Sequence, residues 1–205
     1  DNVLLLNGDA WQRHRQAYRS ALRDVDVMGA SNRVSLSKLE RATPGDLALD
    51  SFVGALVGDV VAGFVASTEL SPELEPHRRR IQYELAGLGI DLQCQPWAYL
   101  SPSRWLKLRH SVEAARAFFS ASVARRLREP DPGTRDVLNG FIALAREGAY
   151  SSEPRELQEG VVNFFFTAHD VLASSTCWCL HLLARHPEIQ EQLAESLAGL
   201  PAGAL

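Results

Sequence analysis

A long stretch without proline near the C-terminal end constrains this chain more than any other feature. Pro154 stands at its start, and no further proline occurs until Pro187. Ser152 or Glu153 can cap a helix there, and proline is favoured in a first helical turn. A helix over 154–185 would be about 48 Å long at ~1.5 Å per residue, enough to cross a whole domain. We therefore expect one central helix around which the rest of the chain packs.

The remaining sequence also has helical periodicity. Apolar residues recur at spacings of three and four, and alternating runs rich in Val, Ile and Thr are absent. Candidate N-caps of these segments are Asp9, Asp50 or Ser51, and Ser71. We predict an all-α domain whose other helices span about 9–22, 31–41, 52–66, 71–92, 101–128, 136–147 and 186–197.

Charge and composition exclude two kinds of partner. A net charge of −4 provides no basic field that would attract nucleic acid. The longest apolar run, Phe52–Ala66, contains Asp59 and is shorter than the ~20 residues of a membrane span. We therefore expect neither nucleic-acid binding nor a membrane span in this segment.

The cysteine content bears on the compartment. Cys94, Cys177 and Cys179 include no Cys-x-x-Cys pair, so the sequence indicates neither a disulfide framework nor a structural metal site. A reducing, cytoplasmic compartment fits this pattern. The chain begins at Asp1 and ends in Ala-Gly-Leu-Pro-Ala-Gly-Ala-Leu, so we expect it to be a segment of a larger protein.

Two pairs of polar residues are candidates for chemistry. His169 and Asp170 lie midway along the long apolar helix, where a polar side chain is costly unless it is used or paired. The alternative is that Asp170 is a satisfied buried carboxylate or points along a solvated groove, and no second His-Asp or Glu set supports a metal site. Trp11 and Arg15 lie one turn apart and present an indole N–H and a guanidinium suited to a carboxylate or phosphate. Their alternative is an aromatic core residue beside a surface arginine.

The sequence around His169 resembles a known family. Residues 166–174 (Phe-Thr-Ala-His-Asp-Val-Leu-Ala-Ser) are similar to the central I helix of the cytochrome P450 family, the haem-thiolate monooxygenases. Residues 182–190 (Leu-Leu-Ala-Arg-His-Pro-Glu-Ile-Gln) are similar to the J helix that follows it. Residues 8–15 resemble the C helix, whose Trp-x-x-x-Arg pair hydrogen-bonds a haem propionate. The resemblance covers essentially the whole chain.

The resemblance implies a partial cytochrome P450 fold, with helices C to J around a long central I helix and one partial domain over residues 1–205. The family's amino-terminal helices, K helix and thiolate loop are not matched. Two pairs fit the K-helix pattern Glu-x-x-Arg by letter, but they precede the long helix and are interpreted as chance matches: Glu75/Arg78 and Glu113/Arg116. No cysteine lies in a glycine-bearing ligand loop, so we expect no metal ligand in this chain and no activity from this chain alone.

For the complete protein, the resemblance implies haem b (iron protoporphyrin IX) and dioxygen activation. The implied substrate is a hydrophobic small molecule, and the implied electron donor is a ferredoxin or flavodoxin with its reductase. Residues 70–127 would be the F to G region that covers the substrate. The implied site residues are the haem contacts Trp11, Arg15 and Ala168 and the catalytic positions Thr167, Asp170 and Val171.

The central motif departs from the family at one catalytic position. The family signature Ala/Gly-Gly-x-Asp/Glu-Thr-Thr/Ser uses its acid and first threonine to deliver protons to dioxygen, whereas residues 167–172 read Thr-Ala-His-Asp-Val-Leu. Val171 cannot hydrogen-bond, so proton delivery would use Asp170, Thr167, a water or a substrate hydroxyl. Two alternatives stay open. One is a haem peroxygenase or a redox-neutral isomerase or dehydratase on the same scaffold, and the other is a truncated, non-catalytic helical module.

Overall fold

The computed structural model describes residues 6–41, 48–94, 101–129 and 133–199. Within these ranges the chain forms eight α-helices and one short 3-10 helix, and no strand. The elements in chain order are α1 (Gly8–Ala21), α2 (Val27–Arg41), α3 (Leu49–Ala66), η2 (Pro72–Leu74), α4 (Glu75–Cys94), α5 (Pro102–Arg128), α6 (Val137–Arg146), α7 (Pro154–Arg185) and α8 (Pro187–Ala198). The all-α fold class is confirmed.

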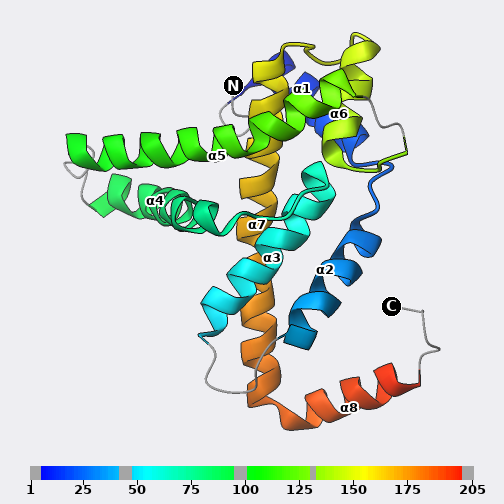
Figure 1. Ribbon diagram of the computed structural model, residues 1–205. Coiled ribbons are helices and arrows are strands. Elements are labelled where there is room, and N and C mark those ends of the chain that lie inside the picture. Colours follow the sequence, from blue (N-terminus) through cyan, green and yellow to red (C-terminus); the bar gives the residue numbers. More distant parts are fainter. Residues whose placement is uncertain (1–5, 42–47, 95–100, 130–132, 200–205) are drawn as a thin grey trace.

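The long central helix is also confirmed. α7 spans Pro154–Arg185, the range predicted from the absence of proline. Leu157, Val161 and Phe165 follow one another at a spacing of four, and each is 0% exposed. In Figure 1, α7 runs the full height of the molecule, and α3 and α5 pack across it. One side of its N-terminal half therefore forms the centre of the core.

α3 is the apolar helix that crosses α7. It begins at Leu49 with Ala48 as N-cap, so the predicted caps Asp50 and Ser51 are wrong and lie in the first turn instead. Among the described residues, α3 is the one helix long and apolar enough to cross a membrane by length and composition, and half of it is buried inside the protein. Lys38 of α2 forms an ion pair with its Asp59. Its packing against α2, α6 and α7 is that of a core helix.

Two other helix starts differ from prediction. Asn7 occupies the N-cap position of α1 without a side-chain capping hydrogen bond, and Asp9 lies in the first turn, where a carboxylate still favours the positive end of the helix dipole. α2 begins at Val27, four residues before the predicted start, because the Asp26 carboxylate accepts a hydrogen bond from the Gly29 N–H at 2.9 Å. The predicted cap Ser71 is confirmed, since its hydroxyl accepts from the backbone N–H of Glu73 at the start of η2.

Asp136 joins the ends of three helices. Its Oδ1 accepts a hydrogen bond from Asn139 N at 2.8 Å and caps α6. Its Oδ2 accepts from Ser67 Oγ at 2.7 Å and from Arg126 Nη2 at 3.1 Å. The side chains of Arg126 and Asp136 are 4% and 1% exposed, and charges buried to this extent must be paired. This junction fixes the C-terminal ends of α3 and α5 against the start of α6.

α8 extends from the C-terminal end of α7, away from α3, α4 and α5 (Figure 1). No residue of α8 is buried. Large apolar side chains are open to solvent here, with Trp178 66%, Leu182 50% and Ile189 49% exposed. An apolar surface of this kind is typical of a face that another segment covers.

Candidate functional site

α1 and α7 meet through two aromatic side chains. Tyr18 of α1 stacks on Phe164 of α7, with ring centroids 5.9 Å apart and an interplanar angle of 24°. The Tyr18 hydroxyl also donates a hydrogen bond of 3.4 Å to the carbonyl oxygen of Gly160. Burial raises the pKa of Tyr18 to about 12, so the phenol stays neutral and remains a donor. This contact fixes the first helix against the N-terminal third of the long one.

Trp11 and Arg15 lie on the same stripe of α1 as Tyr18, at spacings of four and three. The Arg15 guanidinium carbon lies 5.3 Å from the centroid of the Trp11 ring, within cation–π range. Trp11 is 39% exposed, so the alternative that it is a core aromatic is wrong. The structure thus presents an indole N–H and a guanidinium together at the surface.

Three predicted site residues lie on the solvent-exposed side of α7, which we call its open side: Thr167, Asp170 and Val171. The Val171 side chain is 61% exposed. Ala168 is half-buried and packs against the core on the stripe that includes Phe164. Trp11 and Arg15 share a helix face with Tyr18, and Ala168 and Val171 share one with Phe164. Because Phe164 contacts Tyr18, these two faces meet at that contact.

His169 points in the opposite direction, into the core. Its side chain is 1% exposed, and its Nε2 lies 3.0 Å from Arg78 Nη1 and 2.9 Å from the carbonyl oxygen of Gly54. Burial lowers the pKa of His169, and the Arg78 guanidinium lowers it further, so the imidazole is neutral at pH 7. Nε2 faces a donor, Arg78, and an acceptor, the Gly54 carbonyl, so each neutral tautomer satisfies one of them: with the proton on Nδ1 it accepts from Arg78, and with the proton on Nε2 it donates to Gly54. The free-energy cost of burying the polar His169 side chain is therefore offset by its hydrogen bonding.

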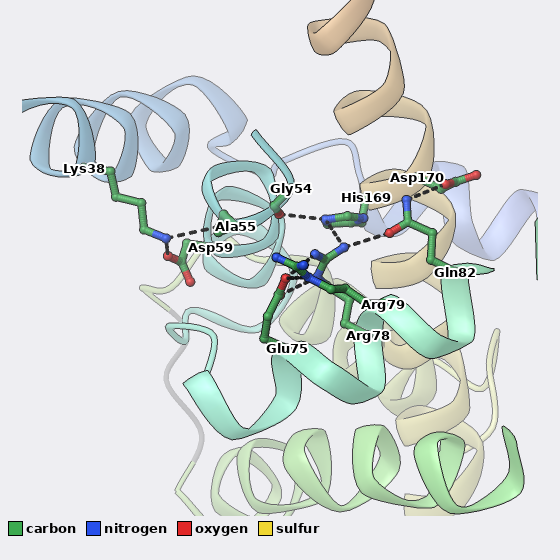
Figure 2. Close-up of polar contacts among 10 residues, drawn as sticks. All are labelled: Lys38, Gly54, Ala55, Asp59, Glu75, Arg78, Arg79, Gln82, His169 and Asp170. Carbon is green, nitrogen blue, oxygen red and sulfur yellow. Dashed lines mark hydrogen bonds and ion pairs between the residues drawn. The ribbon is translucent and has the colours of Figure 1, made fainter. Parts of the chain in front are cut away.

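Arg78 is the centre of a polar cluster between α3, α4 and α7 (Figure 2). Its Nε and Nη2 donate to the two carboxylate oxygens of Glu75 at 2.7 and 2.6 Å. Burial opposes ionisation of Glu75, but the hydrogen bonds from Arg78 and Arg79 prevail and lower its pKa. A Cβ placed on Gly54 would lie 3.1 Å from Arg78 Nη2, so the glycine makes room for the guanidinium.

Gln82 connects this cluster to Asp170. Its Oε1 accepts a hydrogen bond from Arg78 Nη1 at 2.8 Å, and its Nε2 donates to Asp170 Oδ1 at 2.8 Å (Figure 2). The Asp170 carboxylate is therefore exposed and hydrogen-bonded. Of the two alternatives for this carboxylate, the open groove describes it better than the buried position.

A cavity of about 840 Å³ borders Asp170 and is open to solvent. The start of α3 contributes Asp50 and Ser51, α4 contributes Gln82, and α7 contributes Ser174. Because the cavity is open, water can reach the Asp170 carboxylate from this side. The cavity therefore gives solvent access to the carboxylate of Asp170, the predicted acid.

Sequence reasoning missed the parts of this site that α4 supplies. Glu75 and Arg78 were interpreted as a chance match to a K-helix pattern, and their position on α4 agrees with that interpretation, although the two side chains do form an ion pair. Glu75, Arg78 and Gln82 are spaced by three and four, which placed them on one helix face. The spacing was therefore a usable signal, but nothing in it identified the partner helix.

No metal site is seen in the part of the chain that the structure describes. No group of three or more His, Cys, Asp or Glu side chains gathers there. Cys177 is half-buried and Cys179 exposed, and both lie inside α7 rather than in a loop. The side chain of Cys94 lies outside the described residues.

Comparison with known proteins identifies what the chain is similar to. The family model "Cytochrome P450" matches residues 1–200. "Putative cytochrome P450 135B1" of Mycobacterium tuberculosis is 33% identical over 125 residues, which cover 55% of this chain and 26% of that protein. "Leukotriene-B4 omega-hydroxylase 3" of Mus musculus is 25% identical over 236 residues, which cover 99% of this chain and 44% of that protein.

A solved structure has the same fold. "Retinoic acid bound cyanobacterial CYP120A1" superimposes with a TM-score of 0.77 at 19% identity, over 97% of this chain and 45% of that chain. The chain thus spans less than half the length of these relatives.

Proposed function

The chain belongs to the cytochrome P450 family, and from this premise we propose that the complete protein is a haem-dependent monooxygenase that activates dioxygen and oxidises a hydrophobic small molecule. In this proposal, residues 1–205 form one partial domain that covers one face of the haem. Haem supplies the redox chemistry, and the residues described here bind it, orient it and supply protons.

The described residues fit a flat, apolar group with an anionic edge. Arg15 makes no hydrogen bond with another described residue, and the indole of Trp11 lies beside it at the surface. Such exposed donors suit a propionate carboxylate. On α7, Ala168 and Val171 present small apolar surface on the stripe that continues from Phe164. We propose that Trp11 and Arg15 anchor a propionate and that Ala168 lies against the ring.

Proton delivery is assigned to the open side of α7. Asp170 and Thr167 carry the titratable and hydroxyl groups on this side, and Val171 replaces the usual threonine. The carboxylate borders the water-accessible cavity and is held by Gln82. We propose that Asp170 exchanges protons with this water and passes them toward the haem, with Thr167 or a substrate hydroxyl as the second group.

The proposed substrates are long, apolar carboxylic acids. Two similar proteins carry names of this chemistry, one a leukotriene-B4 omega-hydroxylase and the other a structure with bound retinoic acid. Residues 70–127 are the proposed substrate-covering region. We propose a ferredoxin or flavodoxin with its reductase as the electron donor, and a reducing, cytoplasmic compartment.

The observation that carries this proposal is the common origin of the α1 and α7 stripes at Tyr18 and Phe164. It is tested on the complete protein that contains residues 1–205, purified with haem. We expect a thiolate-type spectrum of the ferrous carbon monoxide complex. We also expect hydroxylated product from retinoic acid or leukotriene B4 when reduced nicotinamide and a ferredoxin–reductase pair are supplied.

The same experiment distinguishes the alternatives. Product formed with hydrogen peroxide but not with the reductase pair would identify a peroxygenase. Conversion without either oxidant would identify an isomerase or dehydratase. A complete protein that binds no haem would identify a non-catalytic helical module.

A further inference from the structure

We propose that Gln82 is a positioning residue that holds the Asp170 carboxylate in place, with Arg78 as its anchor. The inference rests on the proposed function, in which Asp170 delivers protons. It concerns side chains that come from α4 and act on a residue of α7, across the contact shown in Figure 2.

The anchor is rigid because every polar atom of the guanidinium edge is engaged. Arg78 is 3% exposed. Its Nε and Nη2 hold the Glu75 carboxylate, and its Nη1 contacts both His169 Nε2 at 3.0 Å and Gln82 Oε1 at 2.8 Å. Gly54 leaves the space that the guanidinium occupies on α3. Arg78 is thus held by side chains of α4 and α7 against the backbone of α3, and it fixes Gln82 in turn.

The direction of the Gln82 amide follows from hydrogen-bond chemistry. Arg78 has donors and no acceptor, so it must face the Oε1 of the amide. An ionised Asp170 has acceptors and no donor, so it must face the Nε2. A side chain between the two needs one acceptor and one donor at the distances found here, 2.8 Å on each side. Glutamine meets this requirement, and the nearly isosteric glutamate does not.

This arrangement limits where the carboxylate can be. Asp170 lies on the open side of α7 beside the open cavity, where an unrestrained side chain would sample several rotamers. One charge-assisted hydrogen bond from a fixed donor favours a single position by roughly tenfold or more. Gln82 therefore affects proton delivery through Asp170 without itself exchanging a proton.

The decisive variant is Gln82→Glu in the complete haem-loaded protein. Glutamate still accepts from Arg78, and so preserves the contact between α4 and α7, but it offers no donor to Asp170. Gln82→Glu also places a second carboxylate beside Asp170, so the neutral Gln82→Met, which loses both contacts, separates loss of the donor from charge repulsion. A role confined to helix packing predicts a wild-type ratio of product to hydrogen peroxide in Gln82→Met. The positioning role predicts unchanged haem content and a roughly tenfold fall in this ratio in both variants.

Two further comparisons complete the test. In an Asp170→Asn background, Gln82→Glu should have no additional effect on the product-to-peroxide ratio, because the acid that it positions has been removed. Arg80→Gln is the matched control, because Arg80 is an exposed residue of the same helix. It should retain the wild-type ratio.

A readout independent of activity is the side-chain amide signal of Gln82 in protein labelled with nitrogen-15 glutamine. The signal is assigned by its loss in Gln82→Glu. We expect it to shift in Asp170→Ala and to stay in place in Arg80→Gln. The positioning role is overturned if Gln82→Glu has the wild-type ratio of product to hydrogen peroxide, or if the amide signal of Gln82 does not shift in Asp170→Ala. If the wild type forms no product, the proposed function fails, and the amide signal alone decides whether Gln82 holds Asp170.

Discussion

Arg78 Nη1 lies 3.0 Å from Nε2 of His169, and the two side chains are 3% and 1% exposed. They come from α4 and α7 and meet at the backbone of α3. A neutral imidazole accepts from the guanidinium, whereas a protonated one would place two cations in contact. The contact of α4 and α7 at the backbone of α3 is therefore favourable only while the His169 imidazole is neutral.

Protonation of His169 should destabilise the fold. Burial and Arg78 lower its pKa in the folded protein, while the unfolded chain takes up the proton near the ordinary value of 6.5. The unfolded state then binds more protons below pH 6.5, so stability is fully present above this pH and falls as the pH is lowered. Urea midpoints of the complete protein between pH 7.5 and 5.5 measure the slope. His169→Gln should flatten it and His181→Gln, an exposed site on α7, should not; equal slopes would contradict the assignment.

Gly140→Ala should destabilise the protein through the contact between α6 and α1. A Cβ at this position would lie 2.6 Å from both the Cα and the carbonyl oxygen of Ala21, and backbone atoms cannot move aside as a side chain end can. Forced separation of packed elements typically costs about 1–3 kcal/mol. Gly199→Ala is the control, since its Cβ would meet ordinary contacts at 3.7 Å. Similar melting temperatures for the two variants would show that α1 and α6 tolerate the shift.

Arg15→Ala should weaken haem retention of the complete protein more than Arg13→Ala. Arg15 lies beside Trp11 on the stripe that leads to Tyr18, whereas Arg13 lies about 200° from Trp11 around the helix. Loss of one charge-assisted hydrogen bond should speed haem transfer to apomyoglobin roughly tenfold or more. Equal transfer rates in the two variants would mean that the propionate anchor is misassigned.

Val171→Thr should improve the coupling of electron use to product. Threonine has nearly the shape of valine and adds a hydroxyl one residue after Asp170, on the open side of α7. General acid help is typically worth ~10²–10⁴-fold where it is missing. Product formed per reduced nicotinamide should therefore rise and hydrogen peroxide release should fall, with Leu172→Thr as the control. Unchanged coupling would favour the peroxygenase or redox-neutral alternative.

Residues 1–205 expressed alone should show no thiolate-type spectrum of the ferrous carbon monoxide complex. Cys177 and Cys179 lie within α7, and the sequence around the cysteines lacks the glycines of a ligand loop. The complete protein, measured in parallel, provides the positive control. A thiolate-type Soret band from residues 1–205 would mean that one of these cysteines binds iron.

The local sequence determined much of the fold. Pro154 and the absence of proline over 155–186 gave the bounds of α7 without error, because a helix continues until a residue removes a hydrogen bond or clashes. Ser71 and the proline after it marked the start of a helix for a similarly local reason, although its first turn is the 3-10 helix η2 and α4 begins at Glu75. The predicted caps of α1 and α3 failed because a carboxylate in the first turn and one at the cap have the same sequence signal, and both interact with the same helix end.

The sequence by itself determined the helical class, the long central helix, and the residue types of the Trp11–Arg15 and His169–Asp170 pairs. These follow from spacing along one chain segment, which periodicity reports directly. The tertiary structure decided that His169 faces the core and Asp170 the open side, because neighbours on a helix point about 100° apart and packing selects which is buried. It also decided the contacts that link α1 to α7 through Tyr18 and Phe164, and Asp170 to Arg78 through Gln82. Such pairings depend on which helices cross and where, and this is set by the packing of the whole core rather than by any one segment.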